Sequence, residues 1–155
     1  MNIFVTSRCP IESAKRLWYN PVRARKMITE SLQMISIYLQ VNNYENIKKV
    51  NGEYFSFQKV IAGNKVTKWL LKDKLHFEWL VDHVESLYKE YEGQGFKNVP
   101  DCLNIIRKYT TDYYDGKYDN IIFYNKAGAK SKDLDYTNLK CVFTAYDMFL
   151  KAQNS

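Results

Sequence analysis

The chain has 155 residues, of which 46% are hydrophobic and 26% are charged, and this composition indicates one soluble domain over residues 1–155. The three cysteines, at positions 9, 102 and 141, show no CxxC or CxxH spacing, which argues against a zinc finger or a disulfide scaffold and favours a cytoplasmic protein. The longest uncharged stretch, residues 31–44, contains four amide side chains and is shorter than the roughly 20 apolar residues of a membrane span, so we expect no membrane partner.

Positive charge is concentrated in the first half of the chain. The net charge is +6, but residues 1–72 hold 12 Lys and Arg against 4 Asp and Glu, whereas residues 73–155 hold 11 against 13. Phosphate groups are contacted mainly by Lys and Arg, so we expect DNA or another polyanion to approach elements made by the first half. The tyrosines of the C-terminal third either fill a small core or stack on bases.

The N-terminal half contains two helix signals and one hairpin signal. The apolar run over residues 2–6 is typical of a strand or an extended arm, and Pro10 then opens a short helix to about Trp18. Asn20-Pro21 is a capping signal for a helix over residues 22–40, in which apolar side chains recur at helical spacing. Asn51-Gly52, between two runs of β-formers, predicts a small hairpin.

The second half is also predicted to be mainly helical. Asn64 and Asp73 cap helices that run to Leu71 and Tyr91, and a further helix opens at Pro100. Residues 110–132 read as loop, with 120–124 extended. The last helix starts at Asp135 or Thr137, ends near Lys151 and buries a stripe that includes Leu139. The fold class is therefore mostly α: a compact single-domain helical bundle with a short N-terminal arm or strand and a small β-hairpin.

The familiar motifs for metals and cofactors are absent from the sequence. His76 and His83 are seven residues apart on one predicted helix, about 10.5 Å along its axis, so they cannot share a metal without further ligands. No HExxH, GxSxG or phosphate-loop motif is present. We therefore predict neither a metal site nor a cofactor.

One face of the helix over residues 22–40 is the main candidate for chemistry. Arg23, Lys26, Glu30 and Gln33 follow i, i+3, i+7 and i+10 spacing, so all four side chains can project together. Lys26 and Glu30 can form an ordinary surface ion pair. If the N-terminal arm and the hairpin cover this face, Glu30 becomes a carboxylate suited to acid–base work beside a phosphate-binding surface.

The order of several short motifs resembles a family of small, mostly uncharacterised phage proteins. These motifs are the opening MNIFVTS, the run Lys26-Met27-Ile28-x-Glu30-Ser31-x-Gln33-Met34, Trp69, the run Phe77-x-Trp79-Leu80-x-x-His83, and Ala145-Tyr146. More distantly, the basic N-terminal helices, followed by Asp73-Lys74-Leu75-x-Phe77 and Gly95-Phe96, are similar to the phage pyrimidine-dimer DNA glycosylases known as endonuclease V.

The distant resemblance implies an all-α enzyme whose N-terminal α-amine attacks C1′ of a damaged nucleotide and forms a Schiff base, assisted by a glutamate. An α-amine is partly neutral at pH 7, which suits this role. Two positions depart from that family: position 2 is Asn rather than the Thr exposed on removal of Met, and Tyr19 stands where the family has its glutamate. The resemblance therefore leaves Met1 as the candidate amine and Glu30 as the candidate carboxylate.

Three functions follow as expectations. The first is a phage-type DNA-processing protein, a glycosylase or base-modifying enzyme in the cytoplasm of the host cell. Its nucleic-acid-binding residues are a basic rim, comprising Arg8, Arg16, Arg23, Arg25 and Lys26, together with Gln33. The second is a non-catalytic binder of nucleic acid or a host protein through a tyrosine-rich surface. The third is a nucleotide-binding protein.

Overall fold

The computed structural model describes residues 2–91, 95–129 and 133–153. Within these ranges the elements are α1 (Pro10–Leu17), α2 (Pro21–Val41), α3 (Lys59–Ala62), α4 (Lys65–Lys72), α5 (Lys74–Glu90), α6 (Val99–Ile106), the 3₁₀ turn η1 (Arg107–Tyr109), β1 (Gly128–Ala129), β2 (Leu134–Asp135) and α7 (Val142–Gln153). The mostly helical fold with a small antiparallel pair of strands confirms the predicted class.

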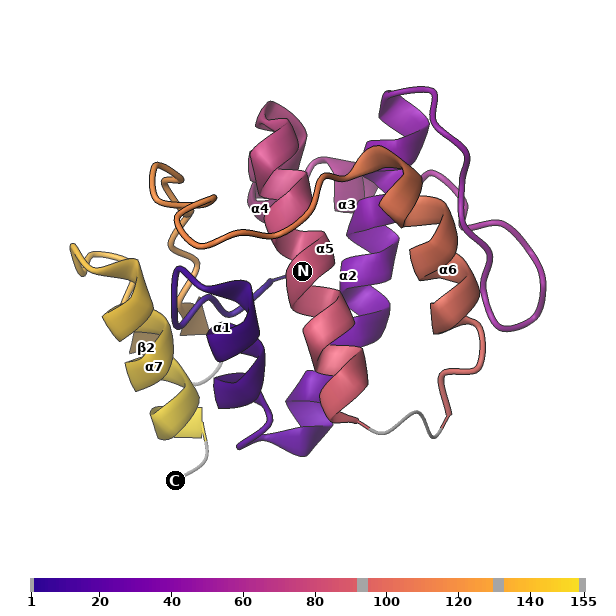
Figure 1. Cartoon of the computed structure of the whole chain (residues 1–155). Coiled ribbons are helices and arrows are strands. Elements are labelled where there is room, and N and C mark those ends of the chain that lie inside the picture. The colour runs from indigo at the N-terminus through magenta and orange to yellow at the C-terminus, as the bar shows by residue number, and fades with distance from the viewer. Residues whose placement is uncertain (1, 92–94, 130–132, 154–155) are drawn as a thin grey trace.

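Helix α5 lies at the centre of the bundle (Figure 1). It begins after Asp73, whose carboxylate accepts a hydrogen bond from the Leu75 amide at 2.9 Å. Helices α1, α2, α4 and α6 all contact it. Its buried apolar side chains are Phe77, Trp79, Leu80, Val81, Val84 and Leu87. Because neighbours surround α5, its polar residues Glu78, Asp82 and His83 are buried too and need partners inside the protein.

Local signals located the helices well. Asn20 caps α2 by accepting a hydrogen bond from the Arg23 amide, and the predicted apolar stripe of α2 is buried. Helices α1, α4 and α5 begin and end within a few residues of their predicted bounds, and α6 begins within one residue of the predicted start at Pro100. The short helix α3 was not predicted, since four residues are too few for helical periodicity to show.

The N-terminal residues form an extended arm, with no strand assigned over residues 2–7. The side-chain amide of Asn2 donates to the Lys126 carbonyl at 3.0 Å, and its oxygen accepts a hydrogen bond from the Tyr146 hydroxyl at 2.7 Å. Phe4 adopts a left-handed backbone with φ of 52°, and its ring packs against Tyr146 and Phe149 of α7. The arm is therefore held against α7.

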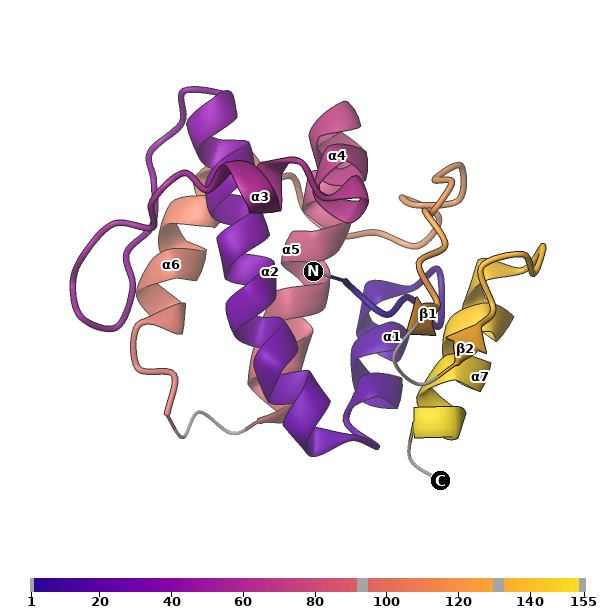
Figure 2. The same ribbon diagram turned by 180° about the vertical axis from the view of Figure 1, so that it is seen from behind.

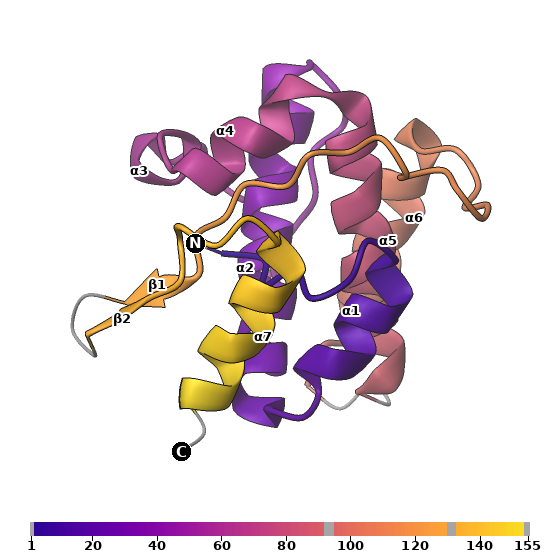
Figure 3. The ribbon, with the colours of Figure 1, turned by 90° about the vertical axis from the view of Figure 1, so that its left-hand side faces the viewer.

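The hairpin predicted at Asn51-Gly52 is reduced to one bridge between Lys48 and Tyr54. Gly52 has the positive φ that the turn needs, but the flanking chain does not continue as strands. The two-stranded sheet lies instead at β1 and β2, within and beyond the stretch predicted as loop. Figure 3 shows this pair projecting from the bundle on the same side as α3.

The predicted start of the last helix is wrong by five to seven residues, since α7 begins at Val142. Tyr136 donates its amide to the Ala127 carbonyl at 2.8 Å, and Asn125 donates to the Tyr136 carbonyl at 3.1 Å. These tertiary hydrogen bonds hold the chain extended just before the helix. Leu139, expected in the core, lies before α7 and is exposed.

Candidate functional site

Arg8 and Arg16, two residues of the predicted basic rim, are engaged inside the protein. Arg8 Nη1 donates to the carbonyls of Tyr118 at 3.0 Å and Ile121 at 2.6 Å. Arg16 Nε pairs with Asp147 Oδ1 at 2.6 Å and so joins α1 to α7. Both guanidinium groups hold the C-terminal third of the chain against α1, which leaves them fewer donors for a phosphate.

Arg23, Glu30 and Lys126 form a second group, the Glu30 cluster, beside the N-terminal arm. Arg23 lies over the Phe4 ring, with the guanidinium carbon 4.6 Å from the ring centroid. Burial lowers the pKa of Arg23 and of Lys126, and the negative charge of Glu30 opposes this effect in both. Half-buried Glu30 therefore interacts electrostatically with two cations. The hairpin that was expected to help cover this face is reduced to one bridge, and Met1 lies outside the described residues.

Arg25, Lys26 and Gln33 are the remaining predicted site residues on α2, the helix in front of α5 in Figure 2. Arg25 and Lys26 are exposed and make no ion pair with the part of the chain that the structure describes. Lys26 and Glu30 are therefore not the i, i+4 ion pair considered above. Gln33 is half-buried and lines a cavity of about 510 Å³ with Lys49, Phe55 and Phe96.

Five exposed lysines lie on or directly beside α3 and α4, and none of them was among the predicted site residues. We call this group the lysine surface: Lys59, Lys65, Lys68, Lys72 and Lys74, all exposed. Lys65, Lys68 and Lys72 follow i, i+3 and i+7 spacing, opposite buried Val66, Trp69 and Leu70 of α4. The signal in the sequence is that residues 54–72 contain four lysines and no Asp or Glu.

A carboxylate network lies on another face of α5. Glu78, Asp82 and Glu85 recur at i, i+4 and i+7, so they share this face. Arg107 Nη2 bonds Asp82 Oδ1 at 2.8 Å and Glu85 Oε1 at 3.1 Å, and Lys117 Nζ lies 3.5 Å from Glu78 Oε2. Sequence reasoning missed this network, although three carboxylates in an apolar helix are a usable signal.

Each buried carboxylate of the network already has internal partners. Glu78 accepts hydrogen bonds from the amide and hydroxyl of Thr111, and Asp82 accepts one from the Tyr118 hydroxyl. Burial and this hydrogen bond raise the pKa of Tyr118. Burial lowers the pKa of Arg107, but its hydrogen bonds with Glu85 and Asp82 outweigh this and raise it overall. The network therefore attaches residues 107–118 to α5.

Comparison with protein-family models, curated proteins and solved structures finds no match to this chain. The functional assignment therefore depends on the geometry of the molecule itself.

The described ranges contain no group of three His, Cys, Asp or Glu residues that could hold a metal ion. His76 stacks on Trp69 with ring centroids 4.2 Å apart, and His83 is buried against Trp79. None of the helices in the described ranges is long and apolar enough to span a bilayer.

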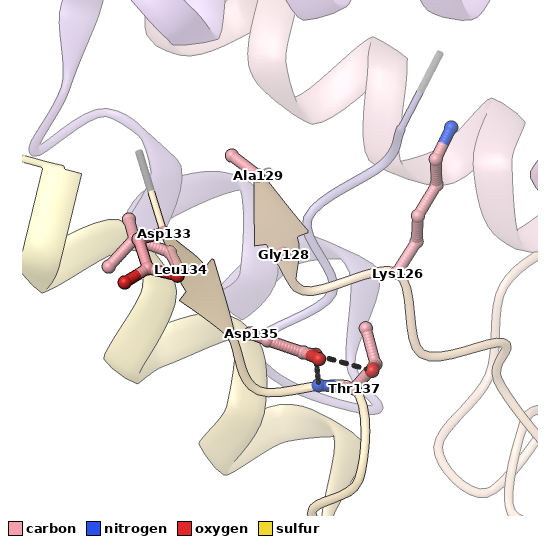
Figure 4. A pocket seen from close by; sticks show the side chains of 7 residues that line it. All are labelled: Lys126, Gly128, Ala129, Asp133, Leu134, Asp135 and Thr137. Carbon is pink, nitrogen blue, oxygen red and sulfur yellow. Dashed lines mark hydrogen bonds between the residues drawn. The ribbon is translucent and has the colours of Figure 1, made fainter. Parts of the chain in front are cut away.

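A cavity of about 420 Å³ lies beside β1 and β2. In Figure 4 the Lys126 side chain extends away from the strands, and the Asp135 carboxylate faces Thr137. Asp135 Oδ1 accepts hydrogen bonds from the Thr137 amide at 3.0 Å and hydroxyl at 2.5 Å, which lower the pKa of Asp135. The carboxylate of Asp135 is thus already hydrogen-bonded within the protein.

The tyrosine-rich surface considered above is smaller than the tyrosine count implies. Tyr118 and Tyr146 are buried, and Tyr109 stacks on Tyr44 with centroids 4.2 Å apart. Tyr113 and Tyr124 are each only 37% exposed. Many tyrosines of the C-terminal third therefore pack against other residues of the protein.

Proposed function

We propose that the protein binds DNA or another polyanion through the lysine surface. The observation that carries the proposal is that these five exposed ammonium groups have no carboxylate within ion-pair distance among the described residues. Asp73, the acidic residue between Lys72 and Lys74, turns its carboxylate to the Leu75 amide. Unbalanced positive charge on one surface attracts phosphates and releases their counterions on binding.

Four exposed lysines elsewhere in the chain are balanced locally, whereas Lys26, Lys48, Lys97 and Lys140 are exposed and make no ion pair with the described residues. Lys15, Lys89, Lys108 and Lys151 each lie within 3.6 Å of a carboxylate oxygen. Such pairs add little stability and leave little net field at the surface. The lysine surface differs from these scattered residues because its five unpaired lysines fall within residues 59–74, which favours a role for it beyond solubility.

A salt titration with a matched variant tests the proposal. The triple substitution Lys65→Ala, Lys68→Ala and Lys72→Ala should weaken DNA binding and flatten its salt dependence by up to about three phosphate equivalents. The control, Lys89→Ala with Lys108→Ala and Lys151→Ala, removes the same charge elsewhere and should keep the slope of the unsubstituted protein. Equal slopes for the two triple variants would refute the proposed interface.

We also propose, as a second candidate, a DNA-processing reaction at the Glu30 cluster. It is favoured by a half-buried carboxylate whose charge acts on Arg23 and Lys126 beside the N-terminal arm. Borohydride trapping on DNA with an abasic site tests the lyase form expected from the distant resemblance. A covalent adduct that is reduced in Glu30→Gln would support this activity, and the absence of any adduct would leave binding alone.

A further inference from the structure

Two aromatic rings are exposed where the chain enters the lysine surface. Tyr54 is 58% exposed and Phe57 is 48% exposed, although each has a large apolar area that the core could bury. Both belong to residues 54–72, the stretch with four lysines and no acidic residue. Three extended residues span at most about 10 Å, so the backbones of Tyr54 and Phe57 lie within that distance of each other, and Lys59 follows Phe57 by two residues.

The backbone that carries these rings is anchored between them. Phe55 is buried, its amide donates to the Ile47 carbonyl at 3.2 Å, and its carbonyl accepts a hydrogen bond from Asn46 Nδ2 at 2.9 Å. Tyr54 is also held by its bridge to Lys48. The exposed rings are therefore presented from a fixed segment, which lowers the entropy lost when a ligand packs on them.

Positive charge lies directly beside the first ring. Lys48 Nζ is 4.9 Å from the centroid of the Tyr54 ring. Lys59 follows Phe57 by two residues at the start of α3, which lies across the upper part of α2 in Figure 2. The Tyr54 ring thus has a cation beside it, and Phe57 has a lysine two residues along the chain. A nucleotide needs this combination of a flat face for the base and an ammonium group for the phosphate.

We propose that the lysine surface takes single-stranded nucleic acid, with Tyr54 and Phe57 stacking on unpaired bases. This inference rests on the proposed function and specifies its ligand. In a duplex the base faces are already stacked on one another, so exposed rings gain nothing from it unless the strands separate. An anionic membrane is less suited, because the rings stand on an extended segment next to the four-residue α3 rather than on a long amphipathic helix.

Fluorescence anisotropy with three probes tests the inference: a labelled single-stranded oligonucleotide, the corresponding duplex, and polyphosphate as a competitor without bases. The unsubstituted protein should prefer the single strand. Tyr54→Ala and Phe57→Ala should each weaken single-strand binding between about 5-fold and about 100-fold. Polyphosphate competition should be unchanged in both variants, since the lysines remain.

The control substitution is Tyr114→Ala, which removes a ring of 61% exposure from outside residues 54–72 and should leave binding unchanged. If the ring variants bind the single strand as the unsubstituted protein does, while the triple lysine variant has lost binding, the inference fails and the proposed function stands. If the lysine variant binds normally, both fail. Binding to phosphatidylserine vesicles that the ring variants lose, without single-strand preference, would overturn the inference in favour of a membrane.

Discussion

His83 is fully buried on α5, where its Nδ1 donates to the Pro10 carbonyl at 3.0 Å. The other ring nitrogen, Nε2, has no hydrogen-bond partner in the described part of the chain. Burial lowers the pKa of His83 from 6.5 to about 4, despite the hydrogen bond that favours the charged form. The side chain is therefore a neutral packing element between α5 and the start of α1.

The low pKa of His83 predicts a loss of stability in acid. Below pH 6.5 the unfolded chain takes up a proton that the folded protein resists down to about pH 4, so stability falls as the pH decreases through this window. Between pH 7 and pH 4.5 the loss should be about 2 to 3 kcal/mol, measured by chemical denaturation.

The comparison for this prediction is His83→Asn, whose amide can still donate to Pro10 but does not titrate. This variant is less stable at pH 7 because it leaves a cavity against Trp79. Its further loss between pH 7 and pH 4.5 should be smaller than that of the unsubstituted protein. An equal loss in both proteins would assign the acid sensitivity to other groups.

A substitution at Glu30 distinguishes a functional residue from a structural charge. It is half-buried and acts on Arg23 and Lys126, so Glu30→Gln removes a favourable charge without emptying space. We expect the free energy of unfolding to change by no more than about 1 kcal/mol, while any activity at this cluster is lost. Thermal denaturation checks the first part, and a loss of several kcal/mol would show a buried structural charge instead.

At the scale of elements, Lys117 fixes the segment after η1 to α5. Its side chain is 1% exposed and lies 3.5 Å from a carboxylate oxygen of Glu78, whose side chain is 4% exposed. The Lys117 ammonium group also donates to the carbonyls of Thr111 and Asp112. A buried ion pair is costly to break because one charge remains without a partner.

Lys117→Met should therefore destabilise the protein by about 3–5 kcal/mol in chemical denaturation. Adding Glu78→Gln to this variant should restore part of the lost stability, because the second substitution removes the unpaired negative charge. A loss below about 1 kcal/mol for Lys117→Met alone would show that water reaches Glu78 and solvates it.

The elements that were predicted correctly carry their signals within a few residues. Asn20, Asn64 and Asp73 cap the helices that they were expected to cap. The errors arise where distant contacts decide the conformation. Tyr136 is held extended by Ala127 and Asn125, so the helix that its neighbours favour starts later.

Sequence spacing could indicate only the part of the Glu30 cluster that lies on one helix. Spacing along α2 identified Arg23, Glu30 and their shared face, but Lys126 comes from the loop before β1. The sequence predicted that Arg8 and Arg16 face a ligand. Their partners in the structure lie 110 and 131 residues further along the chain, so no local pattern indicates them. For the lysine surface, the sequence signal is the absence of acidic residues from residues 54–72.

At the scale of the whole molecule, the N-terminal arm and α7 depend on each other. The Tyr146 hydroxyl donates to Asn2 Oδ1 at 2.7 Å and accepts a hydrogen bond from the Lys126 amide at 3.1 Å. Burial raises the pKa of Tyr146, so the hydroxyl remains protonated as this donor.

Tyr146→Phe should remove both hydrogen bonds and cost about 1–3 kcal/mol. The arm should be affected most, so amide hydrogen exchange at residues 3–5 should accelerate more than exchange in α5. A uniform acceleration across the chain would instead show that arm and bundle open together.

The joining of Asn2 to Lys126 and Tyr146 also imposes an order on biosynthesis. These partners are 124 and 144 residues further along the chain, so the arm has nowhere to dock until nearly all of it has been translated. At about 5–20 residues per second the arm waits on the order of ten seconds, with Phe4 and Val5 uncovered. Helices α1, α2, α4 and α5 can meet during that interval, which makes arm docking a late step on the ribosome and leaves the arm open to chaperones until α7 emerges.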